Sequence, residues 1–159
     1  MNRPVTARAP SLLTLERHQV AELRRLAELS YPYEACGFLV GRRRAARSTP
    51  RVDVREVLHG RNLDASDRTS ATPRRPDRYR LDPEEVLAVD RTARARRLEL
   101  VGFWHSHPDG PPEPSARDLE TLWPDRSYLI VSIDALGSTA LRSFRSTGRG
   151  LGAEPIALT

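Results

Sequence analysis

The stretch from Leu98 to Asp118 constrains the fold of this chain more than any other. Its first part, Leu98 to Trp104, is an apolar run that predicts a buried central strand, and it leads directly into His105-Ser106-His107. Four prolines follow between positions 108 and 114, and then Ser115 and Asp118 stand three positions apart. The chain must therefore fold so that a strand, a stiff loop and a short helix meet at one point.

The spacing within this stretch indicates a metal site. Residues two apart in a strand point to the same side, so His105 and His107 present both imidazoles to one point. Residues three apart on a helix share a face, so Ser115 and Asp118 point together. Two histidines and one carboxylate are a usual ligand set for a catalytic zinc ion. An isolated His-x-His pair is more often structural, but the added Ser and Asp at these offsets favour one Zn²⁺ per chain.

A hydrolytic zinc site needs further groups besides its ligands. Ser115 is suited to donate a hydrogen bond to a developing oxyanion. A base that does not bind the metal must take a proton from water and pass it to the leaving group. The chain has no His-Glu-x-x-His segment, so the helix site of the zincin proteases is excluded.

The other segments predict the elements around this stretch. Helix 14–30 begins at Thr14 as N-cap, and helix 82–97 begins at Asp82 before Pro83 and turns Leu87 inward with its other apolar residues. A third, short helix runs from 115 to about 122. The predicted strands are 34–41, 51–58, 98–104, 127–133, 140–144 and 156–158. This order predicts an α+β protein with a mixed sheet and helices packed against it.

Length and composition favour one domain, residues 11–159, preceded by a disordered Pro- and Arg-rich stretch, residues 1–10. Segment 59–80 is polar and irregular, and we expect a flexible flap beside the active cleft. His59 falls within it and is expected to be structural or exposed. Cys36 is the only cysteine, which excludes an intramolecular disulfide and fits a reducing cytoplasm. We expect its thiol to be buried rather than redox-active.

Charge and hydropathy bear on the partners. The net charge is +5 and all 26 basic residues are arginine, but 21 acids are mixed among them. This mixture favours a solvated surface over a nucleic-acid footprint. No apolar run approaches the roughly 20 residues that span a bilayer, and the first ten residues lack the apolar core of a secretory signal. We therefore expect a cytoplasmic protein that binds neither nucleic acid nor membrane.

Two segments together resemble a known family. His105-Ser106-His107, seven residues, Ser115, two residues and Asp118 match the motif H-[ST]-H-x7-S-x-x-D of the JAMM (MPN+) metalloproteases. Upstream, the segment 32–41 around Glu34 is similar to the catalytic glutamate segment of that family. The small size and the Tyr79-Arg80-Leu81-Asp82-Pro83 stretch look like the stand-alone prokaryotic members. The resemblance spans residues from about 12 to 145.

The resemblance implies a fold and a chemistry. The fold would be a mostly antiparallel, curved sheet flanked by two main helices, with a short helix carrying metal-site residues, as in MPN and cytidine-deaminase-like architectures. Zinc would be held by His105, His107 and Asp118, with Glu34 as general acid/base and Ser115 as oxyanion stabiliser. The enzyme would hydrolyse the amide bond after the C-terminal Gly-Gly of a ubiquitin-like sulfur-carrier protein or its conjugate. The alternative is a non-catalytic MPN-type binding scaffold, and a homodimer is left open.

Overall fold

The computed structural model describes residues 11–66, 78–147 and 150–159, so the segment predicted as a disordered N-terminus and most of the predicted flap lie outside the described residues. The strands are β1 (Leu12–Leu15), β2 (Cys36–Arg44), β3 (Arg51–Gly60), β4 (Glu99–Pro108), β5 (Ser127–Ile133), β6 (Thr139–Thr147), β7 (Gly150–Glu154) and β8 (Ile156–Leu158). The helices are α1 (Arg17–Ser30), α2 (Leu63–Ser66), α3 (Pro83–Ala95) and the 3₁₀ turn η1 (Arg117–Leu119). Among these described helices, none is long and apolar enough to cross a membrane.

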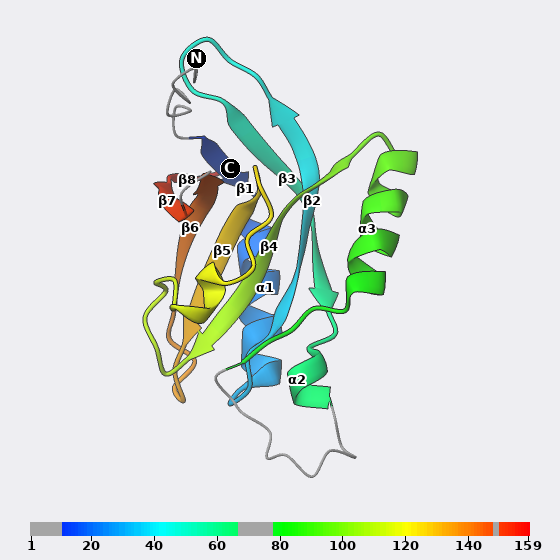
Figure 1. Ribbon diagram of the computed structural model, residues 1–159. Helices are drawn as coiled ribbons and strands as arrows, with labels where there is room; N and C mark the ends of the chain where they lie inside the picture. Colours follow the sequence, from blue (N-terminus) through cyan, green and yellow to red (C-terminus); the bar gives the residue numbers. More distant parts are fainter. Residues whose placement is uncertain (1–10, 67–77, 148–149) are drawn as a thin grey trace, which may run out of the picture.

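All the described strands belong to one curved sheet, in the order β7-β6-β5-β4-β2-β3-β1-β8. Strand β4 pairs with β2 antiparallel and with β5 parallel, so it lies at the centre. Strands β7 and β8 occupy opposite edges although only Pro155 separates them, which requires the sheet to curl until its edges approach each other (Figure 1). The buried Glu154 at this point accepts hydrogen bonds from Ser11 and Ser143.

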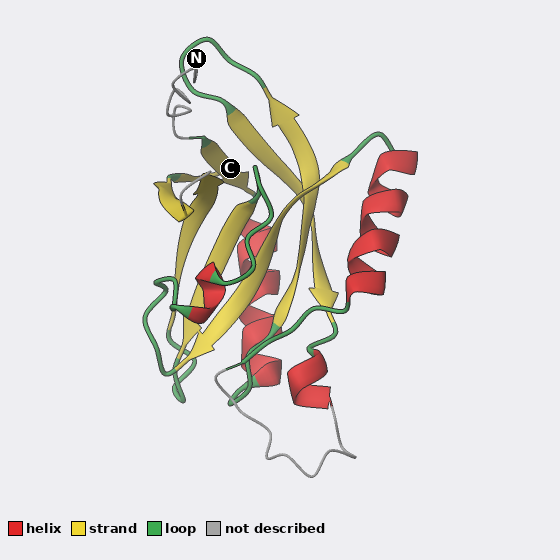
Figure 2. Ribbon diagram, in the orientation of Figure 1, coloured by secondary structure: helices red, strands yellow, loops and turns green. Residues whose placement is uncertain are grey.

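The two longer helices cover opposite faces of the sheet (Figure 2). Helix α1 packs Leu23 and Leu26 onto one face, where Leu39, Trp104 and Leu129 are fully or almost fully buried. Helix α3 contributes Val86 to the other face, which is lined by the following buried residues: Phe38, Leu100, Phe103, Tyr128, Ile130 and Phe144. Because β4 is covered on both sides, the predicted buried central strand and the predicted α+β class with two main helices are confirmed.

The predicted start of the first helix is wrong. Residues 12–15 form β1, which pairs in parallel with β3 and with β8. Leu13 and Leu15 alternate inward and are 0% exposed, which is a strand period rather than a helical one. The helix begins after Glu16, whose side chain and that of Gln19 form a capping box, so Thr14 is not the N-cap. A four-residue strand that pairs only with distant segments has no local signal of its own.

Other element boundaries also differ from the predictions. The short helix is only the 3₁₀ turn at 117–119 rather than a helix from 115 to 122. Strand β4 continues through both histidines to Pro108, and residues 150–154, for which no strand was predicted, form β7. Leu87 is 54% exposed, since Val86 and Ala93 define the inward stripe of α3 and Leu87 is turned about 100° away from it.

Candidate functional site

The end of β4 places two imidazoles on the α3 face of the sheet. Phe103, His105 and His107 alternate with Trp104 and Ser106, and Phe103 belongs to the core beneath α3. The Nε2 atoms of His105 and His107 lie 2.9 Å apart. His105 is 1% exposed, whereas His107 is only partly buried. The period-two prediction for the two histidines is thus confirmed by their meeting at one point.

The loop after β4 turns back toward the sheet and leads into η1 (Figure 1). Asp118 lies in η1 and contacts both histidines. Its Oδ1 lies 3.1 Å from Nε2 of His105, and its Oδ2 lies 3.4 Å from Nε2 of His107. One ligand atom from each of these three residues lies within 4.8 Å of the others. Among the described residues, this is the group of histidine, cysteine and acidic side chains close enough together to hold a metal ion.

The proline-rich loop joins the two histidines to Ser115 and Asp118, and it also orients the ring of His107. The Nδ1 atom of His107 lies 2.8 Å from the carbonyl oxygen of Pro111, an acceptor that requires Nδ1 to carry the proton. Its Nε2 is then the atom left to bind a cation. Asp109 anchors the same loop, since its backbone N–H donates to Ile133 and its carboxylate accepts from the Tyr31 hydroxyl at 2.8 Å.

Burial and the carboxylate set the protonation of the three groups. Burial lowers the pKa of His105 and outweighs its hydrogen bond to Asp118. Burial would also lower the pKa of His107, but the hydrogen bonds to Asp118 and to the Pro111 carbonyl reverse the direction and raise it. Burial opposes ionisation of Asp118, yet its bonds to both histidines hold its pKa far below the usual range. The metal-free site therefore carries an ionised carboxylate beside one readily protonated imidazole.

Ser115 lies directly against Asp118. Its Oγ donates to Oδ2 of Asp118 at 2.8 Å, its backbone N–H donates to the same oxygen at 2.7 Å, and the Asp118 N–H points back to Oγ at 3.2 Å. The pair therefore meets as the spacing predicted, although a turn rather than a full helix brings them together. Ser115 itself is exposed, so its hydroxyl is accessible to a molecule that approaches the site.

Strand pairing brings the Glu34 segment to the same place. Cys36 of β2 pairs with His105 of β4, so Glu34 precedes β2 next to the end of β4. Glu34 is 8% exposed, and its negative charge contributes to raising the pKa of His107. Cys36 is fully buried, and burial raises the pKa of its thiol, which agrees with the expected structural role. The structure thus groups all five predicted site residues at one end of β4.

Three further residues at the site had no predicted role there. Ser106 alternates with the two histidines along β4. Its Oγ accepts the Ala35 N–H at 2.8 Å, and its own N–H donates to the Ala35 carbonyl at 2.9 Å. The Tyr79 ring stacks on His105 with centroids 4.5 Å apart. Asn62 donates to the carbonyl of Glu34 at 3.0 Å. Asn62 and Tyr79 lie in the irregular polar segment, which offered no periodicity to single them out.

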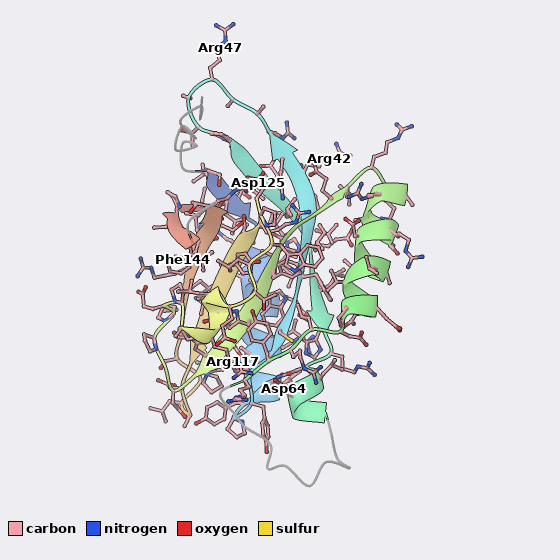
Figure 3. All side chains as sticks on the ribbon, viewed as in Figure 1. Arg42, Arg47, Asp64, Arg117, Asp125 and Phe144 are labelled. Carbon is pink, nitrogen blue, oxygen red and sulfur yellow. The ribbon has the colours of Figure 1, made fainter. Side chains whose placement is uncertain are left out.

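Figure 3 labels Arg117, which precedes Asp118, and Asp64, which follows Asn62 by two residues. Both lie toward the same end of the molecule. Asp64 donates its backbone N–H to Asn62 at 3.0 Å. The described part of segment 59–80 borders the site through Asn62 and Tyr79, as predicted. It is more regular than predicted, since β3 extends to Gly60 and residues 63–66 form α2. His59 is exposed, and its ring centroid lies 6.4 Å from that of Trp104, which agrees with the expectation that it is structural or exposed.

Comparisons with known proteins agree with this geometry. Residues 16–147 match the family model described as prokaryotic homologs of the JAB domain. A desampylase of Haloferax volcanii is 38% identical over 104 residues, which cover 65% of this chain and 65% of that protein. A desampylase of Pyrococcus furiosus is 31% identical, with 72% of this chain and 70% of the relative covered. The match to the first relative thus spans just under two thirds of its length.

Solved structures share the fold. A protein of Desulfitobacterium hafniense, solved in solution, superposes with a TM-score of 0.73 at 32% identity and covers 92% of both chains. A protein of Salinibacter ruber has a TM-score of 0.63 at 31% identity, with 92% of this chain and 90% of the other covered. The curled mixed sheet with a helix on each face is therefore shared along nearly the whole length of these chains.

Proposed function

Since this chain belongs to the family of prokaryotic homologs of the JAB domain, we propose that it is a zinc-dependent hydrolase of JAMM type. Its substrate would be the amide bond that follows the C-terminal Gly-Gly of a ubiquitin-like sulfur-carrier protein, or of its conjugate. The observation that carries the proposal is the convergence of His105, His107 and Asp118, with Glu34 and Ser115 beside them. The name desampylase of two relatives, which refers to hydrolysis of ubiquitin-like conjugates, supports the substrate class.

The donor set fits zinc. Two imidazole nitrogens and one carboxylate oxygen would hold a single ion and leave a position open, the composition typical of catalytic rather than structural zinc sites. The hydrogen bond from His107 to Pro111 supports the fit, because ligating histidines usually donate their other N–H to a carbonyl or carboxylate. Zinc bound there supplies the Lewis acidity that activates water near neutral pH.

The chain's own residues would complete the reaction. Glu34 would accept the proton of the attacking water and deliver it to the leaving nitrogen, the role of a general base that then acts as general acid. The exposed Ser115 hydroxyl, which can rotate away from Asp118, would donate to the substrate carbonyl oxygen as charge develops on it. The buried single thiol, Cys36, takes no part in these steps and is compatible with a cytoplasmic enzyme.

The direct test uses zinc-loaded protein and a ubiquitin-like carrier extended by several residues after Gly-Gly. We expect mass spectrometry to show a single cut after the second glycine, and the same cut in a conjugate linked through a lysine side chain. A carrier ending in Ala-Ala and enzyme treated with a zinc chelator are the controls. Intact substrates in the presence of stoichiometric zinc would contradict the proposal and favour a non-catalytic binding scaffold.

Zinc affinity is expected to fall as the pH is lowered through the range in which His107 takes up a proton. Its pKa is raised in the metal-free site, so below that pKa zinc must displace one proton, and the dissociation constant rises about tenfold per pH unit. The pKa of His105 is lowered by burial, so His105 is expected to contribute less to this proton release than His107. Calorimetry at pH 6 in two buffers of different ionisation enthalpy measures this release. A pH-independent affinity between pH 5.5 and 7.5 would contradict it.

A further inference from the structure

Asn62 uses its whole hydrogen-bonding capacity next to the site. Its Nδ2 donates to the carbonyl of Glu34 at 3.0 Å and to that of Arg78 at 2.9 Å. Its Oδ1 accepts the N–H of Asp64 at 3.0 Å and that of Arg80 at 3.1 Å. A side-chain amide has two donors and two lone pairs, so all four are occupied in a residue that is 9% exposed.

These four bonds join segments that are far apart in the chain. Glu34 stands immediately before β2, whereas residues 78–80 lead into α3. Asn62 also forms an isolated antiparallel bridge with Leu81, and the Leu63 N–H donates to the Arg80 carbonyl at 2.9 Å. Through its two donors, the Asn62 amide links the Glu34 carbonyl directly to the carbonyl of Arg78, at the start of the described segment that leads into α3.

The returning segment places an aromatic ring on a metal-site residue. Tyr79 lies between the two residues that Asn62 binds, and its ring stacks on His105 at a centroid distance of 4.5 Å with 22° between the planes. On the opposite side, Ser106 binds both backbone groups of Ala35, the residue after Glu34. Glu34 is thus fixed to β4 on its C-terminal side and to the Tyr79 segment through its own carbonyl.

We propose that Asn62 is a positioning residue that sets the Glu34 carboxylate relative to His105, His107 and Asp118, and that holds Tyr79 against His105. The catalytic part of this inference rests on the proposed function, whereas the positioning of the two segments does not. Its side-chain amide is fully used in these four bonds within the protein, so Asn62 acts through Glu34 and Tyr79. Its loss should therefore impair the chemical step rather than substrate binding, because small displacements of a catalytic group lower the rate steeply.

The test compares Asn62→Ala and Asn62→Asp with the zinc-loaded wild type. The Asp variant keeps the oxygen that accepts the N–H groups of Asp64 and Arg80 but loses both N–H donors. It can therefore replace the Ala variant in the test if the Ala variant does not fold. Arg61→Ala is the matched control, because that neighbouring side chain is exposed and pairs with Asp82 outside the site. NMR of the His105 ring protons reports the Tyr79 stack, and Tyr79→Leu defines the shift expected when the ring is absent.

We expect both Asn62 variants to lower kcat about 10- to 100-fold with KM nearly unchanged, and to move the His105 ring resonances in the direction seen in Tyr79→Leu. Arg61→Ala should match the wild type in both measurements. Unchanged kcat and unchanged His105 resonances in a folded Asn62 variant would overturn the proposal, as would a loss confined to KM. If the wild type itself shows no turnover, the proposed function fails, and the His105 shift alone decides whether Asn62 positions the site.

Discussion

Glu34→Gln is expected to lower turnover by roughly 10²- to 10⁴-fold, the usual contribution of a general acid/base. Glutamine has almost the same shape and can occupy the same nearly buried position, but it can neither take a proton from water nor return one to the leaving nitrogen. Because Glu34 is not among the three grouped ligands, zinc should stay bound at one ion per chain. Steady-state kinetics on the extended carrier, together with metal analysis, measures both quantities.

The matched control is Glu120→Gln, which changes an exposed glutamate two residues after Asp118. It should leave turnover and zinc content unchanged, so any loss in Glu34→Gln reflects the position and not the loss of a negative charge near the site. Loss of zinc in Glu34→Gln would mean that Glu34 is a ligand. Full activity in that variant would assign the base to another group.

Asp118→Asn is expected to lower zinc affinity by about 100-fold or more, since even partners outside the ligand set cost 10- to 100-fold when they are mutated. The change removes the one negative charge among the three grouped residues. It also removes the charged hydrogen-bond acceptor that lies between the two histidines and raises the pKa of His107. Activity at limiting zinc should disappear and should return in part when zinc is added in excess. Competition with a chromogenic zinc chelator measures the affinity.

Asp125→Asn is the control for this variant. Asp125 precedes β5 and pairs loosely with Arg145 at 3.8 Å, and Figure 3 shows it toward the opposite end of the molecule from Arg117. It should bind zinc as the wild type does. Wild-type zinc affinity in Asp118→Asn would exclude this carboxylate as a ligand and leave the two histidines without their predicted partner.

Most of the candidate site could be predicted because its spacing is local. His105 and His107 meet through the period of a strand, and Ser115 and Asp118 meet over three residues even though a 3₁₀ turn replaces the predicted helix. The position of Glu34 could not be predicted in this way, because no helical or strand period relates residue 34 to residue 105. Only the family resemblance named it, and the pairing of Cys36 with His105 is what brings its segment to the site.

The boundaries that were wrong share one cause. Strand β1 pairs with β3 and β8, and β7 pairs with β6 across a curled sheet, so both depend on partners outside any local window. Local propensity assigned residues 14–16 to a helix and gave no strand at residues 150–154, because short segments carry too little signal to oppose their neighbours. Segments with a strong local signal were placed well: β5 is a nearly continuous apolar run, and α3 begins with a clear N-cap at Asp82.

By itself, the sequence determined the chemistry available to this protein: two imidazoles, a carboxylate and a hydroxyl on a strand, a stiff loop and a turn. These relations are short-range, and backbone geometry alone enforces them. The tertiary structure alone decided that the Glu34 carboxylate lies near them and which contacts hold its segment there. Asn62, Ser106 and Tyr79 contact Glu34, Ala35 and His105 through hydrogen bonds and stacking between residues 26 to 71 positions apart. Such contacts exist only after the sheet has closed around β4.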